Sequence, residues 1–287
     1  MGFRSNCTAL TVVLSATVCS FHAVAAPLAV DLTDSASTLA QALLGGSVTI
    51  VGTPTLNSQP GQSGLFTNFG SGPFVQTGGN PGQYTIPSGI VLSTGVASAA
   101  TGNYIGGPSA DLMGSGNAQL SALTGNSTFD AAVLTTRFTS ANPTLSLNYV
   151  FASAEYPAFI GSISDALGIF VNGSNVALVP GTATPVSINS VNANVNSSFF
   201  TQYSTPNTPF NYGGATTILT ATANVSTSAV NTIQLAIADS LDGNLDSAVF
   251  IQSVGAMSVP EPASLAVLAA GLLSLGATVA IRRKQRD

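Results

Sequence analysis

The sequence is poor in charge and almost free of the side chains on which most catalytic sites depend. Of its 287 residues, 6% are charged, and the chain contains one His, two Cys and no Trp. An average soluble protein has roughly 25% charged residues. Solubility must therefore come from uncharged polar side chains, and the recurring runs of β-branched and aromatic residues favour a folded core over disorder.

The few basic residues lie almost entirely at the two ends of the chain. Between Arg4 and the basic residues of 282–286, Arg137 is the one base. Nine acids lie between residues 26 and 258: Asp31, Asp34, Asp111, Asp130, Glu155, Asp165, Asp239, Asp242 and Asp246. Phosphate backbones and anionic lipids repel such a domain, so nucleic acid is excluded as a partner, whereas cations and uncharged sugars are compatible. We expect Arg137 to form an ion pair with one of the acids.

Residues 1–25 have the three parts of a secretory signal peptide. Arg4 provides the positive start, the apolar stretch "CTALTVVLSATVCSF" follows, and the small residues of 23–25 form the cleavage site. We expect the export machinery and signal peptidase to process the chain after Ala25. An uncleaved anchor helix is the alternative.

Cleavage would remove every thiol and imidazole from the protein. Cys7, Cys19 and His22 are the only Cys and His residues, and all three precede the cleavage site. Thiol nucleophiles, Ser–His–Asp triads and zinc sites built from His or Cys are thereby excluded from the mature chain.

Residues 259–287 combine an apolar run with a basic tail. The 19 residues from Ala263 to Ile281 carry no charge, and as a helix they would extend about 28 Å, enough to cross a bilayer. The tail at 282–287 would remain in the cytoplasm by the positive-inside rule. We therefore predict a transmembrane helix over 263–281, with the main domain on the far side of the inner membrane.

The same segment contains the tripeptide Pro260-Glu261-Pro262 ahead of the apolar run. In this order the three features resemble the PEP-CTERM sorting signal of exopolysaccharide-producing Gram-negative bacteria. The resemblance implies that an exosortase recognises the motif and removes the helix. The protein would then be released to the cell envelope, the outer surface or the extracellular matrix. A plain anchor after a stiff linker is the alternative.

Residues 26–258 show the period of two that is typical of β-strands. Apolar and polar residues alternate in "TLSLNYVF" and in "NTIQLAIAD". Before them, "SASTLAQALLGG" predicts one short helix near the N-terminus, and 61–82 reads as a long loop. Further strands are expected at 47–52, 89–95, 131–138, 166–173, 175–180, 185–191, 216–225 and 247–256.

This pattern predicts a mainly β protein with a single β-sandwich, jelly-roll-like in type. A solenoid is the alternative, although the sequence has no repeat of fixed length. The stretches "SGIVLSTG", "FDAAVLTTRF", "LSLNYVFASAEYPAFIGSISDALGIFVNG", "PVSINSVN" and "LAIADSLDGNLDSAVF" resemble the choice-of-anchor L domain of bacterial surface proteins. The resemblance extends from about 32 to 256 and implies a β-rich surface domain without an established activity.

One part of this chain departs from that family pattern. Where the family stretch reads like S-E-E-Y-P-E-F, this chain has "SAEYPAF" at 153–159, so that two acids are replaced by alanine and Glu155 remains. A metal site built by those acids in relatives would be weakened here.

The stretch "ADSLDGNLDSAVF" carries oxygen ligands at a spacing that suits calcium. Asp242, Asn244 and Asp246 occupy positions one, three and five of a short loop, and Asp239 could add a further oxygen. The alternative is an ordinary hairpin whose acids are solvated or bond the turn backbone.

A second constellation is Glu155, Tyr156 and Asp165, which we expect to form a surface site at one end of the domain. A pair of carboxylates suits a glycosidase, but the same residues could serve only to cap turns.

Three function classes therefore remain. A structural or adhesive role at the surface or in exopolysaccharide is favoured, without enzymatic activity. A carbohydrate-binding module, with calcium as an optional cofactor, is second, and a glycosidase is third. Sugar-stacking faces in the second class would come from Tyr84, Tyr104, Tyr156, Tyr203 and Tyr212.

Overall fold

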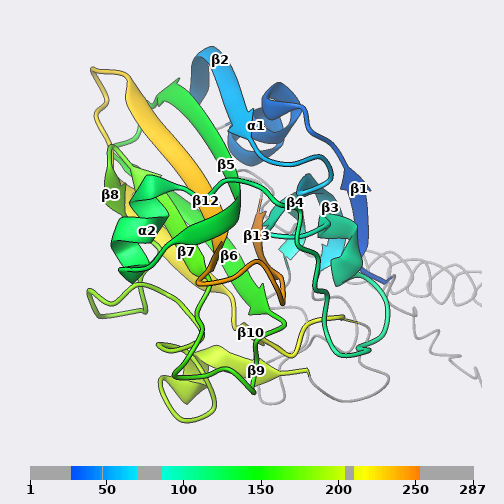
Figure 1. The fold of residues 1–287 in the computed structure, drawn as a ribbon. Coiled ribbons are helices and arrows are strands. Elements are labelled where there is room, and N and C mark those ends of the chain that lie inside the picture. The colour runs from blue at the N-terminus through cyan, green and yellow to red at the C-terminus, as the bar shows by residue number, and fades with distance from the viewer. Residues whose placement is uncertain (1–26, 47, 70–85, 204–209, 253–287) are drawn as a thin grey trace, which may run out of the picture.

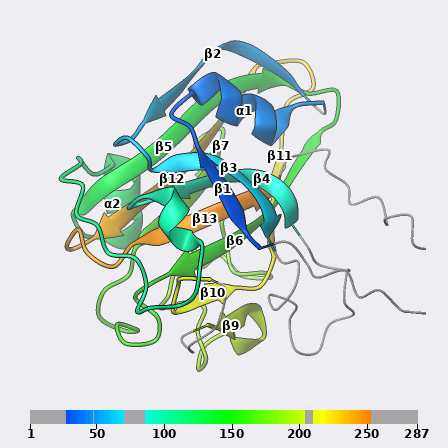
Figure 2. The same ribbon diagram turned by 90° about the vertical axis from the view of Figure 1, so that its right-hand side faces the viewer.

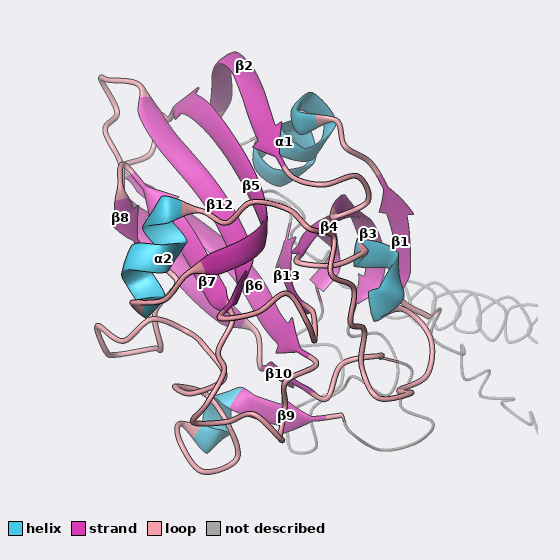
Figure 3. Ribbon diagram, viewed as in Figure 1, coloured by secondary structure: helices cyan, strands magenta, loops and turns pink. Residues whose placement is uncertain are grey.

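The computed structural model describes residues 27–46, 48–69, 86–203 and 210–252 (Figure 1). The signal peptide, the sorting motif and the transmembrane helix expected over 263–281 lie outside these residues. Within the described ranges, no helix is long and apolar enough to cross a membrane. Figure 3 shows that strands dominate and helices are few, so the prediction of a mainly β fold with two sheets is confirmed. The finer assignment to the jelly-roll type stays a prediction.

The larger sheet has eight strands, all paired antiparallel in the order β1-β3-β4-β13-β6-β10-β9, with β11 also paired to β6. Its strands are β1 (Ala29–Leu32), β3 (Ser63–Phe69), β4 (Ile86–Ser93), β6 (Thr144–Ser153), β9 (Phe200–Gln202), β10 (Gly214–Thr216), β11 (Leu219–Asn224) and β13 (Ser247–Gln252).

The smaller sheet has five antiparallel strands in the order β2-β5-β12-β7-β8. Its strands are β2 (Thr49–Asn57), β5 (Thr128–Thr139), β7 (Ala166–Val171), β8 (Ser174–Asn175) and β12 (Asn231–Ser240).

The two sheets share one hydrophobic core, which the alternation in the sequence builds directly. Every second residue of the central strands faces this core. Examples are Leu147 and Tyr149 of β6 and Leu235 and Ile237 of β12. The expected short helix is present as α1 (Ala36–Leu44), which begins at the N-cap Ser35 and contributes its leucines to the same core. It lies beside β2, as Figure 2 shows.

The outer faces of both sheets are covered as well. On the larger sheet, Phe66, Phe210 and Phe250 form a second apolar cluster beneath the 3-10 helix η1 (Ala97–Ala100). On the smaller sheet, α2 (Ala118–Thr124) packs Leu120 against β5, β7 and β12. A further 3-10 turn, η2 (Ser197–Phe199), precedes β9.

Three sequence predictions for the fold are wrong. Of the strand expected over 175–180, only Asn175 lies in a strand, at the end of β8, and Leu178 forms an isolated bridge with Pro185. The loop expected over 61–82 contains β3, whose Phe66 and Phe69 pack in the outer cluster. The strand expected over 185–191 is a series of turns, because the Ser190 hydroxyl donates to the Pro185 and Ser187 carbonyls and competes with strand pairing.

The connection from β12 to β13 determines the structure of one end of the molecule. The two strands do not form a hairpin, because β12 belongs to the smaller sheet and β13 to the larger. The loop 241–246 is therefore a corner that carries the chain from one sheet to the other. Leu241 and Leu245 both have positive φ values there, at 77° and 62°, which is costly for residues with a large side chain.

Candidate functional site

At the end of the molecule next to this corner, the inward-facing rows of the core change from apolar to polar. The row Ile233, Leu235 and Ile237 of β12 continues with Asp239. Likewise, Asp165 lies two residues before Leu167 of β7, which faces the core. At this end of the shared core, carboxylate and hydroxyl side chains therefore occupy positions where apolar side chains would be expected.

Four of these carboxylates form what we call the acidic cluster: Glu155, Asp165, Asp239 and Asp246. Each is at most 1% exposed. Glu155 follows β6, Asp165 precedes β7, Asp239 lies in β12 and Asp246 precedes β13, so both sheets contribute to it. The cluster joins the Glu155–Asp165 pair to two of the acids of the 239–246 stretch, although the sequence pattern predicts two separate sites.

Backbone amides hold three members of the cluster in place. The N–H of Asp165 donates to Oε2 of Glu155 at 3.3 Å, and the N–H of Ser240 donates to Oδ1 of Asp165 at 3.2 Å. The N–H of Ala110 donates to Oδ1 of Asp246 at 2.8 Å. Each of these three carboxylates thus has one oxygen fixed by the backbone and one left over.

The remaining oxygens of the acidic cluster have no hydrogen-bond partner among the described residues. They are Oε1 of Glu155, Oδ2 of Asp165, Oδ2 of Asp246 and both carboxylate oxygens of Asp239. The hydroxyl groups of Tyr212, Ser240 and Ser247 are buried and unpartnered as well. Buried polar groups without partners are rare in folded proteins, so this concentration at one place calls for a ligand or for protons.

Asp130 is a fifth buried acid nearby, but its chemistry differs from that of the cluster. Its carboxylate accepts the N–H groups of Leu112 and Gly114, and Gln62 donates to its carbonyl oxygen at 2.6 Å. Asp130 therefore secures the loop that precedes α2 and has no free oxygen to offer.

Burial raises the pKa of every member of the acidic cluster. The pKa of Asp239 rises from 3.8 to about 8, through burial first and the charge of Asp246 second, and the nearby Thr94 hydroxyl offsets part of the rise without reaching hydrogen-bond geometry. The pKa of Glu155 rises to about 7 and that of Asp246 to about 6, again mainly through burial. Burial and the charges of Glu155 and Asp239 hold the pKa of Asp165 well above its ordinary value.

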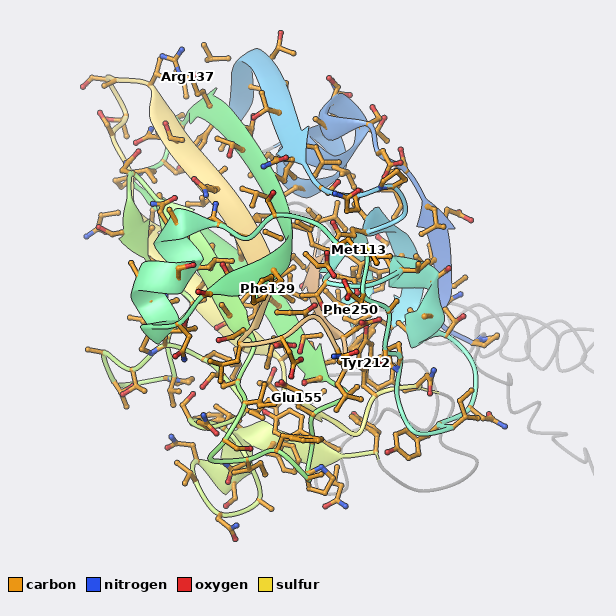
Figure 4. The ribbon with its side chains drawn as sticks, in the orientation of Figure 1. Met113, Phe129, Arg137, Glu155, Tyr212 and Phe250 are labelled. Atoms are coloured by element: carbon orange, nitrogen blue, oxygen red, sulfur yellow. The ribbon has the colours of Figure 1, made fainter. Side chains whose placement is uncertain are left out.

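No protein cation lies close enough to neutralise these charges within the described part of the chain. Arg137, its one base, is exposed near the far end of β5. Seven strand residues separate it from Asp130, or roughly 23 Å, and Figure 4 shows Arg137 and Glu155 at opposite ends of the molecule. The expected ion pair between Arg137 and an acid is therefore not made with the cluster.

The cluster does not present a ready-made set of metal ligands. In the ranges that the structure covers, no group of three or more His, Cys, Asp or Glu side chains is arranged to hold a metal ion by itself. Any ion bound here would need hydroxyl groups or water in its coordination shell.

A polar cleft of 490 Å³ opens beside the cluster, between α2 and the segment after β8. Asp165 forms part of its wall, together with hydroxyl and amide side chains such as Ser164, Ser187, Asn189 and Asn196. Asp165 is the member of the acidic cluster that borders this cleft, and the polar part of the lining is suited to groups that hydrogen-bond without charge.

The four residues expected from the sequence to bind calcium lie in different environments in the structure. Asp239 and Asp246 are buried in the acidic cluster, whereas Asn244 is exposed. Oδ1 of Asp242 accepts the N–H of Asn244 at 3.0 Å, so this side chain bonds its own turn. Whether the set binds calcium stays a prediction, with the four residues in two different environments.

The residues expected to form a surface site lie in the interior. Glu155, Tyr156 and Asp165 are each 1% exposed, because β6 runs into the core and carries the following residues with it. The Tyr156 hydroxyl donates to the carbonyl oxygen of Val191 at 2.5 Å. Tyr156 and Tyr212 are thus unavailable for stacking on a sugar, Tyr203 packs against Phe210, and Tyr84 lies outside the described residues.

Several residues of the site were missed from the sequence. Asp130, Ser240 and Ser247 lie in strands of ordinary sequence, and Tyr212 lies just before β10. Only the packing of the two sheets brings them to the same end. One signal was present: in "LAIAD" the alternation that places Leu235 and Ile237 in the core also predicts that Asp239 faces inward.

Comparison with known families agrees with this architecture. The model of the choice-of-anchor L domain matches residues 29–256. The chain belongs to the choice-of-anchor L family. A second model, the PEP-CTERM protein-sorting motif, matches residues 258–284. No curated protein and no solved structure matches the chain. The two family matches indicate an exported choice-of-anchor L protein of the cell surface, and the sorting motif implies processing by an exosortase.

Proposed function

We propose that this choice-of-anchor L protein is a structural or adhesive component of the cell envelope or of the exopolysaccharide matrix. In this proposal signal peptidase removes residues 1–25, the apolar segment 263–281 holds the chain briefly in the inner membrane, and an exosortase releases it. One observation carries the proposal: the domain match ends at residue 256 and the sorting match begins at 258. Almost the whole mature chain is then a domain delivered by a sorting signal.

Cell fractionation tests this proposal with the variant Glu261→Ala, which removes the central acid of the sorting motif. The unaltered chain should appear in the matrix or outer-surface fraction in a shortened form. The Glu261→Ala chain should accumulate uncut in the inner membrane, while Asp34→Ala, an exposed acid in the domain, should behave like the unaltered chain. Sorting of Glu261→Ala to the matrix at the normal level would contradict the proposal.

We further propose that the protein is not an enzyme. A glycosidase needs two carboxyl groups that flank an accessible glycosidic bond, whereas Glu155 and Asp165 are buried and share a hydrogen bond through the Asp165 amide. Release of reducing ends from matrix polysaccharide should be undetectable with the purified protein. Turnover that disappears in Glu155→Gln would refute this part of the proposal.

Carbohydrate binding is the second candidate function, and the polar cleft is the observation that favours it. Its serine, threonine and asparagine side chains match the hydroxyl groups of an uncharged sugar. A bulky side chain at Ser164→Tyr should fill the cleft and abolish retention on exopolysaccharide. The control Ser37→Tyr, on the exposed side of α1, should leave retention unchanged. Equal retention of both variants would exclude the cleft as the binding site.

A further inference from the structure

Asp239 is the feature of this domain that its fold alone does not explain. It occupies an inward-facing position at the end of β12, is fully buried, and has no hydrogen-bond partner among the described residues for either carboxylate oxygen. A core of this size would normally place an apolar residue there, as it does at Leu235 and Ile237, four and two residues earlier.

The surroundings of Asp239 contain acceptors in excess of donors. Asp165 and Asp246 each have one buried oxygen without a hydrogen-bond partner among the described residues, and both interact electrostatically with Asp239. An isolated buried carboxylate is very costly unless it is paired, protonated or bound to a metal. Since the single base of the described chain is exposed at the other end of β5, no side chain there pairs with these carboxyl groups, and protons or a cation from solvent must offset their charge.

We propose that Asp239 anchors a hydrated hard divalent cation, Ca²⁺ or Mg²⁺, between the end of β12 and the start of β13, with Asp165 and Asp246 on either side. Carboxylate, hydroxyl and water oxygens are the ligands that these ions prefer. The proposal is independent of the role in the matrix, because it concerns how the two sheets are held together at this end.

The positions of the carboxylate and hydroxyl groups determine the coordination shell that we propose. Because no three carboxylates in the covered ranges are arranged to hold an ion directly, Asp239 would bind the ion itself and Asp165 and Asp246 would act mainly through water. The unpartnered hydroxyl groups of Ser247 and Tyr212 supply further oxygens at this end of the larger sheet. Asp165 also borders the polar cleft, so the proposed site lies next to a solvent-filled recess.

This site differs from a calcium loop formed by the turn itself. Asn244 is exposed and Asp242 bonds its own turn, so neither residue is required here. Replacing them should leave ion binding intact, whereas replacing Asp239 should abolish it. The two arrangements are therefore separable by mutation.

The experiment uses protein expressed from the full-length sequence and purified after export. Thermal melts are recorded in chelator, in millimolar Ca²⁺ and in millimolar Mg²⁺, because an ion that binds only the folded state raises the melting temperature. For a domain of this size we expect a rise of about 5 °C or more at an ion concentration a hundredfold above Kd. The ion that produces the larger rise is assigned to the site.

Three variants locate the ion. The rise should vanish in Asp239→Asn and persist both in Asn244→Ala and in the exposed control Asp31→Asn. Persistence in Asp239→Asn, or loss in Asn244→Ala, would overturn the proposal.

Equilibrium dialysis provides a readout that does not depend on a variant folding correctly. The unaltered protein should bind one Ca²⁺ or Mg²⁺ per chain. Binding of neither ion at millimolar concentration would overturn the proposal, whatever the melts of the variants show.

Discussion

Replacing Asp239 by Asn should stabilise the metal-free protein at neutral pH, although it changes a fully buried side chain near the end of β12. The carboxyl group has an ordinary pKa of 3.8 and a folded-state pKa of about 8. The raised pKa contributes its full stabilisation of the folded state only where the carboxyl group is protonated in both the folded and the unfolded chain, that is below about pH 4. That contribution is lost progressively as pH rises from about 4 to about 8, because the unfolded chain ionises first.

The size of the effect follows from the same shift. At pH 7 the unfolded carboxyl group is ionised and the folded one is still mostly protonated, so the free energy of unfolding is lower by about 4 kcal/mol than at acid pH. Asn has the same shape and no charge, but its buried amide keeps part of the desolvation cost. We expect a net gain of about 2–4 kcal/mol, which corresponds to roughly 5–15 °C in Tm for a domain of this size.

The assay is a set of melts of the unaltered protein, Asp239→Asn and Asp31→Asn in chelator at pH 4 and pH 7. Asp239→Asn should exceed the unaltered protein in Tm at pH 7 and match it at pH 4, and Asp31→Asn should follow the unaltered protein at both values. A Tm for Asp239→Asn that is lower at both pH values would mean that the carboxylate forms a favourable interaction in the metal-free fold. The reasoning from uncompensated burial would then be refuted.

Three further changes test the structure around the site, each by its effect on Tm in a thermal melt. Gly95→Ala places a Cβ on the Asp246 carboxylate, so it should cost about 1–3 kcal/mol and reduce the response to divalent ions; an unchanged Tm would contradict the close approach of these two residues. Tyr156→Phe leaves the buried Val191 carbonyl without its donor and should cost about 1–3 kcal/mol, and a neutral result would argue against that hydrogen bond. Asn117→Ala removes the side chain that accepts two amides at the start of α2 and should cost about 1 kcal/mol, with no effect on ion binding. Loss of ion binding in this last variant would show that α2 supports the acidic cluster.

Local pattern was enough for most of the elements of this fold. The alternation in 144–151 and 231–239 predicted β6 and β12, and the spacing of leucines before Gly45 predicted α1. Prediction was wrong where local chemistry was ambiguous. β3 was hidden in a stretch rich in Gly and Gln, and the turns at 185–191 depend on a serine hydroxyl that bonds the backbone.

The candidate site was predictable only in part. The sequence drew attention to Glu155, Asp165, Asp239 and Asp246, because acids are so few in this chain. It placed them in two separate groups, one on the surface and one in a short loop interpreted as a calcium site or, alternatively, as a hairpin turn. The structure shows one buried cluster, because the chain changes sheets between β12 and β13.

The sequence by itself determined the β-rich class, the excess of acid over base in the domain and the sorting segment that follows it. These are properties of composition and of short periodic patterns, which need no knowledge of distant contacts. Only the tertiary structure decided that four acids from β12 and from the ends of three other strands meet in the interior. That outcome depends on which sheet each strand joins, and sheet membership is set by pairing between segments far apart in the chain. Burial then changes the chemistry of ordinary carboxyl groups by removing the water that would otherwise solvate them.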